Sequence, residues 1–157
     1  MRKLLVGLTL ALLPSALAAQ ASPVTVTSSI QAVKEVVDAK GVKTRTLVAP
    51  TTVIPATPIV VWINYKNTGA APVSNFVINN PVPNGVHFTG LGENSGWGVV
   101  SIDGGKSFGA LTALKVTNPD KSVRAAIPQD VTHIRWTFAK PIAANGNGTL
   151  SFYAVVK

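Results

Sequence analysis

Cysteine is absent from this chain of 157 residues, which also has only two histidines and six acidic residues. Without cysteine, disulfides, thiolate metal sites and thiol nucleophiles are excluded. Two histidines and few acids are also a poor supply of zinc ligands. We therefore expect no cofactor and no metal-dependent catalysis, while loop acids such as Glu93, Asp103 and Asp120 leave calcium as an open alternative.

Charged residues are scarce as well, at 13% of the chain, and 14 Lys and Arg give a formal net charge of +8. The basic residues are spread along the sequence and form neither a dense run nor a ribbon interleaved with aromatic residues. This pattern does not indicate a nucleic-acid partner. Weak attraction to anionic surfaces is the interpretation that the charge favours.

The first 21 residues have the three parts of a secretory signal peptide. Residues 1–3 are positively charged, residues 4–13 are apolar, and small residues follow at cleavage spacing. The apolar part is shorter than the roughly 20 residues that span a bilayer, and no second long apolar run follows. We expect a signal helix over 1–21 cleaved after Ala18 or Ala21. The mature chain then has no membrane span and lies in the periplasm, at the cell surface or outside the cell.

Short strand patterns rich in β-branched residues dominate residues 22–157, and clusters of Gly, Pro, Asn and Asp separate them. Residues 59–65 and 131–138 show the clearest alternation. The pattern predicts a single all-β domain, an antiparallel β-sandwich of about seven to nine strands. Residues 22–48 are predicted to be an extended N-terminal arm. Trp62 and Trp136 lie inside strand patterns and are predicted to belong to the core.

Two consecutive segments carry a resemblance to a known family. Residues 53–69 (VIPATPIVVWINYKNTG) form a strand pattern that ends in an Asn-Thr-Gly corner, and residues 71–86 add a second strand and a Pro-Asn-Gly turn. Over residues 24–90 this resembles the bacterial conserved repeat domain, also called domain of unknown function eleven. The chain departs from that family at Ala56, where the family has glycine. The resemblance implies an immunoglobulin-like sandwich of adhesins, envelope layers or extracellular filaments, without catalytic residues.

Residues 101–108 (SIDGGKSF) resemble the Asp-box of sialidase propellers, in which an aspartate caps its own turn. We predict a structural hairpin turn at Asp103, Gly104 and Gly105, with the glycines supplying positive φ. A propeller needs about four blades or more, and one copy of the motif therefore does not indicate a sugar-cleaving enzyme.

The pair Asp130 and His133, together with the many serines, invites comparison with a hydrolase triad. Residues three apart on a strand project to opposite faces, however, and no Gly-x-Ser-x-Gly elbow occurs in the sequence. We therefore expect a protein that is not an enzyme.

The Gly-rich loop of residues 93–98 (ENSGWG) holds the candidate contact residues for a ligand or partner, Glu93, Asn94 and Trp97. An exposed Trp97 offers a flat face to a sugar ring, and the alternative is that it packs over the end of the sandwich as core. The sequence thus favours an exported, non-enzymatic structural or adhesion component, such as a filament subunit, that binds copies of itself or other surface proteins. The alternative is a carbohydrate-binding module that uses Trp97 to bind a glycan.

Overall fold

The computed structural model describes residues 23–50 and 54–157, so the predicted signal peptide over 1–21 lies outside the described residues. The predicted all-β class is confirmed, since the described part consists of ten strands and three short 3-10 helices. The strands are β1 (Val24–Val37), β2 (Lys43–Val48), β3 (Pro58–Asn67), β4 (Val77–Pro81), β5 (Val86–Leu91), β6 (Val99–Ser101), β7 (Lys115–Thr117), β8 (Val123–Ala125), β9 (His133–Thr137) and β10 (Asn147–Val156). The helices are η1 (Glu93–Ser95), η2 (Leu111–Ala113) and η3 (Pro128–Asp130).

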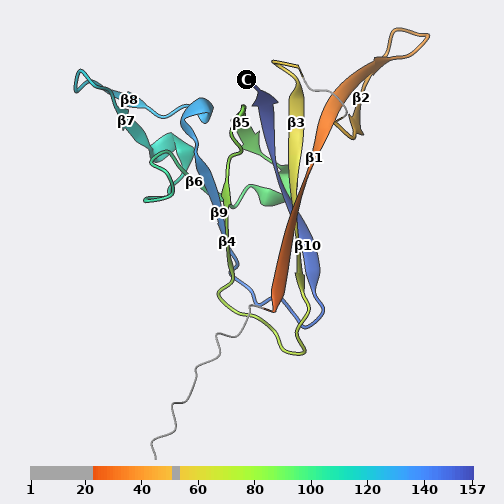
Figure 1. Cartoon of the computed structure of the whole chain (residues 1–157), viewed down its shortest axis with the longest axis vertical. Coiled ribbons are helices and arrows are strands. Elements are labelled where there is room, and N and C mark those ends of the chain that lie inside the picture. Colours follow the sequence, from red (N-terminus) through yellow and green to blue (C-terminus); the bar gives the residue numbers. More distant parts are fainter. Residues whose placement is uncertain (1–22, 51–53) are drawn as a thin grey trace, which may run out of the picture.

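The strands form two antiparallel sheets that face each other, which confirms the predicted sandwich (Figure 1). The wide sheet has the order β2-β1-β3-β10-β5, and the narrow sheet has the order β4-β9-β6. Strands β7 and β8 form a separate ribbon at the upper left of Figure 1. From β3 to β6 the chain passes from one sheet to the other at every step, and β10 returns to the wide sheet between β3 and β5.

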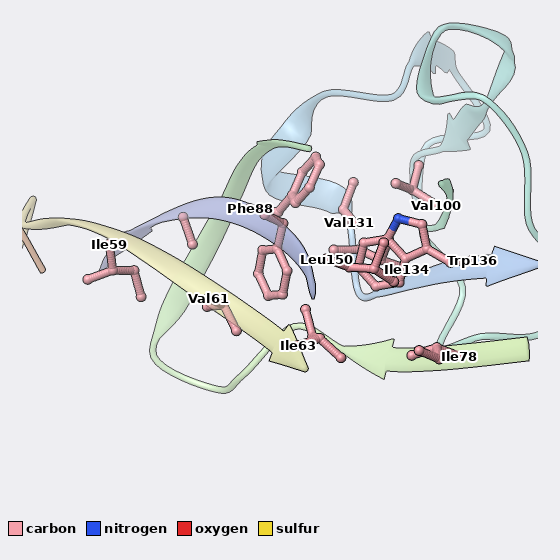
Figure 2. Packing of buried hydrophobic residues seen from close by; sticks show 12 residues of the cluster. Ile59, Val61, Ile63, Ile78, Phe88, Val100, Val131, Ile134, Trp136 and Leu150 are labelled. Carbon is pink, nitrogen blue, oxygen red and sulfur yellow. The ribbon is translucent and has the colours of Figure 1, made fainter. Parts of the chain in front are cut away.

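The core fills the space between the sheets with inward-facing residues of β3, β4, β5, β6, β9 and β10 (Figure 2). Ile63 of β3 and Phe152 of β10 are fully buried on the wide sheet, and Ile134 and Trp136 are fully buried on the narrow sheet. The indole Nε1 of Trp136 donates to the backbone oxygen of Ser95 at 2.9 Å. Burial of each such side chain contributes about 1.5–3 kcal/mol, and Trp136 is core, as predicted.

The Asn67 side chain connects two segments at one end of the sandwich, the β3–β4 link and the β9–β10 link. Its amide nitrogen lies 2.9 Å from the carbonyl oxygen of Ala71 and 3.0 Å from those of Ile142 and Ala143. Its Oδ1 accepts the backbone N–H of Gly69 at 3.0 Å. Asn67 is fully buried, so this amide ties the β3–β4 link to the β9–β10 link.

Within residues 22–48, predicted as an extended arm, strands β1 and β2 form a hairpin that belongs to the wide sheet. Strand β1 pairs with β3 through its first part and with β2 through its last part. At the turn between β1 and β2, Asp38 Oδ1 accepts the backbone N–H groups of Lys40 and Val42 at 2.8 and 2.9 Å. The tip of this β1–β2 hairpin extends beyond the other strands at the upper right of Figure 1.

The inner face of β1 is not covered by the narrow sheet. Val26 and Ile30 project from β1 on the side of the core, yet they are 42% and 39% exposed. Val61, the partner of Ile30 on β3, is only 2% exposed. Two apolar side chains, Val26 and Ile30, with the polar Ser28 between them, are therefore open to solvent on this face of β1.

Ala56 stands in the turn before β3 with φ of 67°, in the left-handed region that favours glycine. Its backbone N–H donates to the carbonyl oxygen of Val156 at 2.9 Å. The backbone at Ala56 thus has the conformation that favours glycine, the residue found at this position in the family that the chain resembles.

Candidate functional site

The predicted contact residues lie around η1, between β5 and β6. Glu93 and Asn94 are exposed on η1. Ser95 is buried, and its Oγ accepts the backbone N–H of Ser151 at 2.7 Å. Because Ser95 is tied to both β10 and Trp136, η1 is a fixed support for the residues that follow it.

Two environments were predicted for Trp97, an exposed platform or the core, and its side chain has part of each. Its side chain is 47% exposed, and its ring packs edge-to-face on Phe138 with the centroids 5.3 Å apart. A hollow of about 430 Å³ beside it is lined by Trp97, Thr137, Phe138, Ala139 and Lys140. Glu93 and Asn94 do not line this hollow, so the structure does not bring the three predicted contact residues together in it.

The Asp103 carboxylate organises the loop after β6. Its Oδ1 accepts from the Ser101 hydroxyl at 2.7 Å and from the Lys106 N–H at 3.0 Å, and its Oδ2 accepts from the Ser107 hydroxyl at 2.6 Å. These bonds hold the pKa of Asp103 far below its usual range, and the bond from the Ser107 hydroxyl has the largest effect. Gly104 and Gly105 have φ of 77° and 86°. Asp103 thus makes its bonds within its own turn, and the loop is closed by a bridge between Val100 and Gly109.

Asp130 is engaged by an arginine and does not form the start of a triad. Arg124 donates to both of its carboxylate oxygens, at 2.6 and 2.7 Å, and the N–H of Ile127 adds a bond at 2.8 Å. His133 instead places Nδ1 3.2 Å from the Thr132 hydroxyl oxygen. Within residues 23–50 and 54–157 no three His or acidic side chains gather as a metal-binding group.

The Asp130–Arg124 ion pair predicts a difference in acid stability. Hydrogen bonding to Arg124 lowers the pKa of Asp130 from its ordinary value of 3.8, so the pair stabilises the fold fully above that pH. Its contribution is lost as the pH falls through the lowered folded pKa. Both groups are partly exposed, so Asp130→Asn should cost about 1 kcal/mol or less at neutral pH.

Thermal unfolding followed by circular dichroism from neutral pH down to about pH 2 checks this expectation. The wild-type melting temperature should fall more steeply below about pH 4 than that of Asp130→Asn. Glu93→Gln, which removes an exposed carboxylate elsewhere, is the matched control. Parallel acid profiles of Asp130→Asn and the wild type would contradict the assignment.

A larger hollow, not predicted from the sequence, lies on the outer face of the wide sheet. It measures about 660 Å³ and takes side chains from β1, β2, β3, β5 and β10. We call it the outer groove, and its principal lining residues are Val33, Arg45, Leu47, Trp62 and Tyr153.

The prediction that Trp62 belongs to the core is wrong. Trp62 is half-buried on the outer face, where its Nε1 donates to Gln31 Oε1 at 2.7 Å. Ile63, its neighbour on β3, is fully buried on the inner face. The signal was present in the sequence, because strand alternation places Trp62 on the same face as the polar Asn64 and opposite to Ile63.

No family model, curated protein or solved structure matches the chain. The likeness to the bacterial conserved repeat domain stays a prediction drawn from residues 53–86. In the part of the chain that the structure describes, no helix is long and apolar enough to cross a membrane.

Proposed function

We propose that the protein is an exported, non-enzymatic β-sandwich that serves as a structural or adhesion component outside the cell and assembles as a filament subunit. Strand pairing between copies holds the assembly together. The observation that carries the proposal is the uncovered inner face of β1, with Val26 42% and Ile30 39% exposed, beside an unfilled edge of the narrow sheet.

That unfilled edge belongs to β4. Strand β4 ends the narrow sheet and pairs with β9 on one side, and within the described residues no strand pairs with its other side. Val77 at the start of β4 is 41% exposed. Pro81 at its end has no backbone N–H and cannot donate a hydrogen bond to an added strand. The β4 edge therefore offers peptide groups to a new strand.

A strand added beside β4 would cover β1. Ile78 of β4 packs in the same core cluster as Ile63 of β3 (Figure 2), and β3 is the neighbour of β1 in the wide sheet. At the other side of the sandwich, β6 follows β5 through the short η1 link. The next strand position outward from β4 thus faces Val26 and Ile30, and filling it would bury both.

Strand β2 of a neighbouring copy fits this position. It has six residues against five in β4, and it forms the outer edge of the wide sheet on the protruding hairpin. Leu47 and Val48 on β2 are 45% and 38% exposed. Contact between two different surfaces, here β2 of one copy and β4 of the next, is heterologous, and it grows into a filament when the rotation between copies does not close a ring.

Two variants that each contain one cysteine test the contact, because the chain itself has none. Thr46→Cys in β2 is mixed with Asn79→Cys in β4, and a short bismaleimide is added. We expect a covalent dimer on denaturing gels and filaments of the wild type in electron micrographs. Asp120→Cys, in the turn between β7 and β8, replaces Asn79→Cys as the control. Equal cross-linking in both mixtures, or a wild type that stays monomeric at every concentration, would overturn the proposal.

A carbohydrate-binding module that uses Trp97 stays the alternative prediction. What favours it is the exposed part of the Trp97 ring beside a hollow that also includes Lys140. In that case a glycan bound by the wild type would be lost in Trp97→Ala.

A further inference from the structure

We propose that the outer groove binds an acidic oligosaccharide through its carboxylate-bearing sugars. The groove, about 660 Å³, falls within the range of about 300–1,000 Å³ found for small-molecule sites. It lies on the outer face of the wide sheet, away from Trp97, and two of its lining residues, Arg45 and Leu47, are on β2, the strand that the proposed assembly places beside β4 of the next copy. Sugar binding needs one copy of the protein and the assembly needs two, so the calorimetric test and the cross-linking test can fail independently.

Two aromatic rings form the platform of the groove. Tyr153 of β10 is opposite Val60 of β3, and Trp62 lies two residues further along β3 on the same face. Val60 is 3% exposed and forms the floor between them, while Tyr153 is 40% exposed. A sugar ring carries C–H groups on one face, which stack on such rings while its hydroxyls remain free for polar groups.

The platform is held in place before any ligand arrives. The hydrogen bond of 2.7 Å from Trp62 Nε1 to Gln31 Oε1 fixes the indole on the sheet. All the strands that contribute side chains are paired in one sheet. Little conformational freedom is therefore lost when a sugar stacks on Trp62, which favours affinity.

The charges at one side of the groove favour an anionic sugar. Glu35 also lines the groove and is opposite Arg45 in the β1–β2 pairing, but its carboxylate forms an ion pair with Lys43 at 2.7 Å. The Glu35 charge is thus balanced by Lys43, and the Arg45 charge remains for a ligand. Within the described residues no side chain or carbonyl bonds the Arg45 guanidinium. A guanidinium without a partner is suited to bind a carboxylate through two parallel hydrogen bonds. Arg2 and Lys3 lie in the predicted signal peptide, so residues 22–157 hold 12 basic and 6 acidic residues, and their formal net charge of +6 adds a general attraction for anions.

Isothermal titration calorimetry of the whole mature protein with two kinds of carboxylated sugar tests the inference. One arm uses tetragalacturonate against its methyl ester, and the other uses sialyllactose against lactose. In each pair the sugar is matched and the carboxylate is masked or missing. We expect at least one acidic sugar to bind about tenfold more tightly than its neutral counterpart, the gain of one charge-assisted contact.

Variants then assign the site. Tyr153→Ala should weaken binding about tenfold, and Arg45→Gln should remove the preference for the acidic form. Trp97→Ala controls for the other exposed ring, and Lys115→Gln on β7 controls for the loss of one positive charge. Circular dichroism confirms that each variant is folded.

Three results would overturn the proposal. The first is that the wild type binds neither acidic sugar, and the second is that it binds acid and neutral forms equally. The third is that Trp97→Ala or Lys115→Gln loses as much affinity as the groove variants, since binding would then belong to Trp97 or to the net charge.

Discussion

Replacing Trp136 by alanine is expected to lower the free energy of unfolding by about 3–5 kcal/mol. The side chain is fully buried and packs in the core between the two sheets. Its loss leaves a cavity that the surrounding strands, each fixed by ladder hydrogen bonds, fill only in part. The change also leaves the Ser95 carbonyl without the indole N–H, 2.9 Å away, that now satisfies it.

Unfolding in guanidinium chloride, followed by circular dichroism, measures the effect. Trp97→Ala is the matched control, because it removes the same side chain from a position that is 47% exposed. The control should lose about 1 kcal/mol or less. Trp136→Phe, which keeps most of the packing but not the indole N–H, should fall between the two. A similar loss in Trp97→Ala and Trp136→Ala would show that the core does not depend on Trp136 as described.

Replacing Asn67 by alanine is expected to lower the free energy of unfolding by about 3 kcal/mol. The buried amide serves the carbonyl oxygens of Ala71, Ile142 and Ala143 and accepts the N–H of Gly69. Alanine satisfies none of these groups, and each buried polar group left without a partner carries a cost of about 1–3 kcal/mol.

The same denaturation experiment with Asn64→Ala provides the comparison. Asn64 is on the same strand but exposed, and its side chain accepts one bond, from the Thr149 hydroxyl at 2.8 Å. Its removal should cost less than about 1 kcal/mol. Asn67→Asp should be at least as harmful as Asn67→Ala, because it places a carboxylate among carbonyl oxygens. If Asn67→Ala were as stable as Asn64→Ala, the Asn67 side chain would not tie the β3–β4 link to the β9–β10 link.

Much of the fold follows from strand alternation alone. The inward residues of β3 and β10, such as Ile63 and Phe152, are apolar at every second position, and this pattern predicts a sandwich core. Residues 30–37, which also fit a helix, form part of β1, because the β-branched Val36 and Val37 favour an extended backbone. Local preference and burial agree in these segments, so the sequence is informative there.

The long-range features were not predictable in the same way. Asn67 reads as an ordinary turn residue, and its role depends on Ile142 and Ala143, which are 75 and 76 positions further along the chain. The outer groove depends in turn on the pairing of β10 with β3, which brings Tyr153 next to Trp62. A sequence pattern gives the face on which a side chain lies, but not which distant strand becomes its neighbour.

The three tryptophans of the chain occupy three different surroundings: the core at Trp136, the outer groove at Trp62 and the loop after η1 at Trp97. Each indole therefore works as a built-in optical probe of a different event. The emission of Trp136 should lie at the blue end and shift to the red on unfolding, whereas quenching by a ligand should act first on Trp62. Versions of the protein that keep a single indole would separate these signals without any added dye.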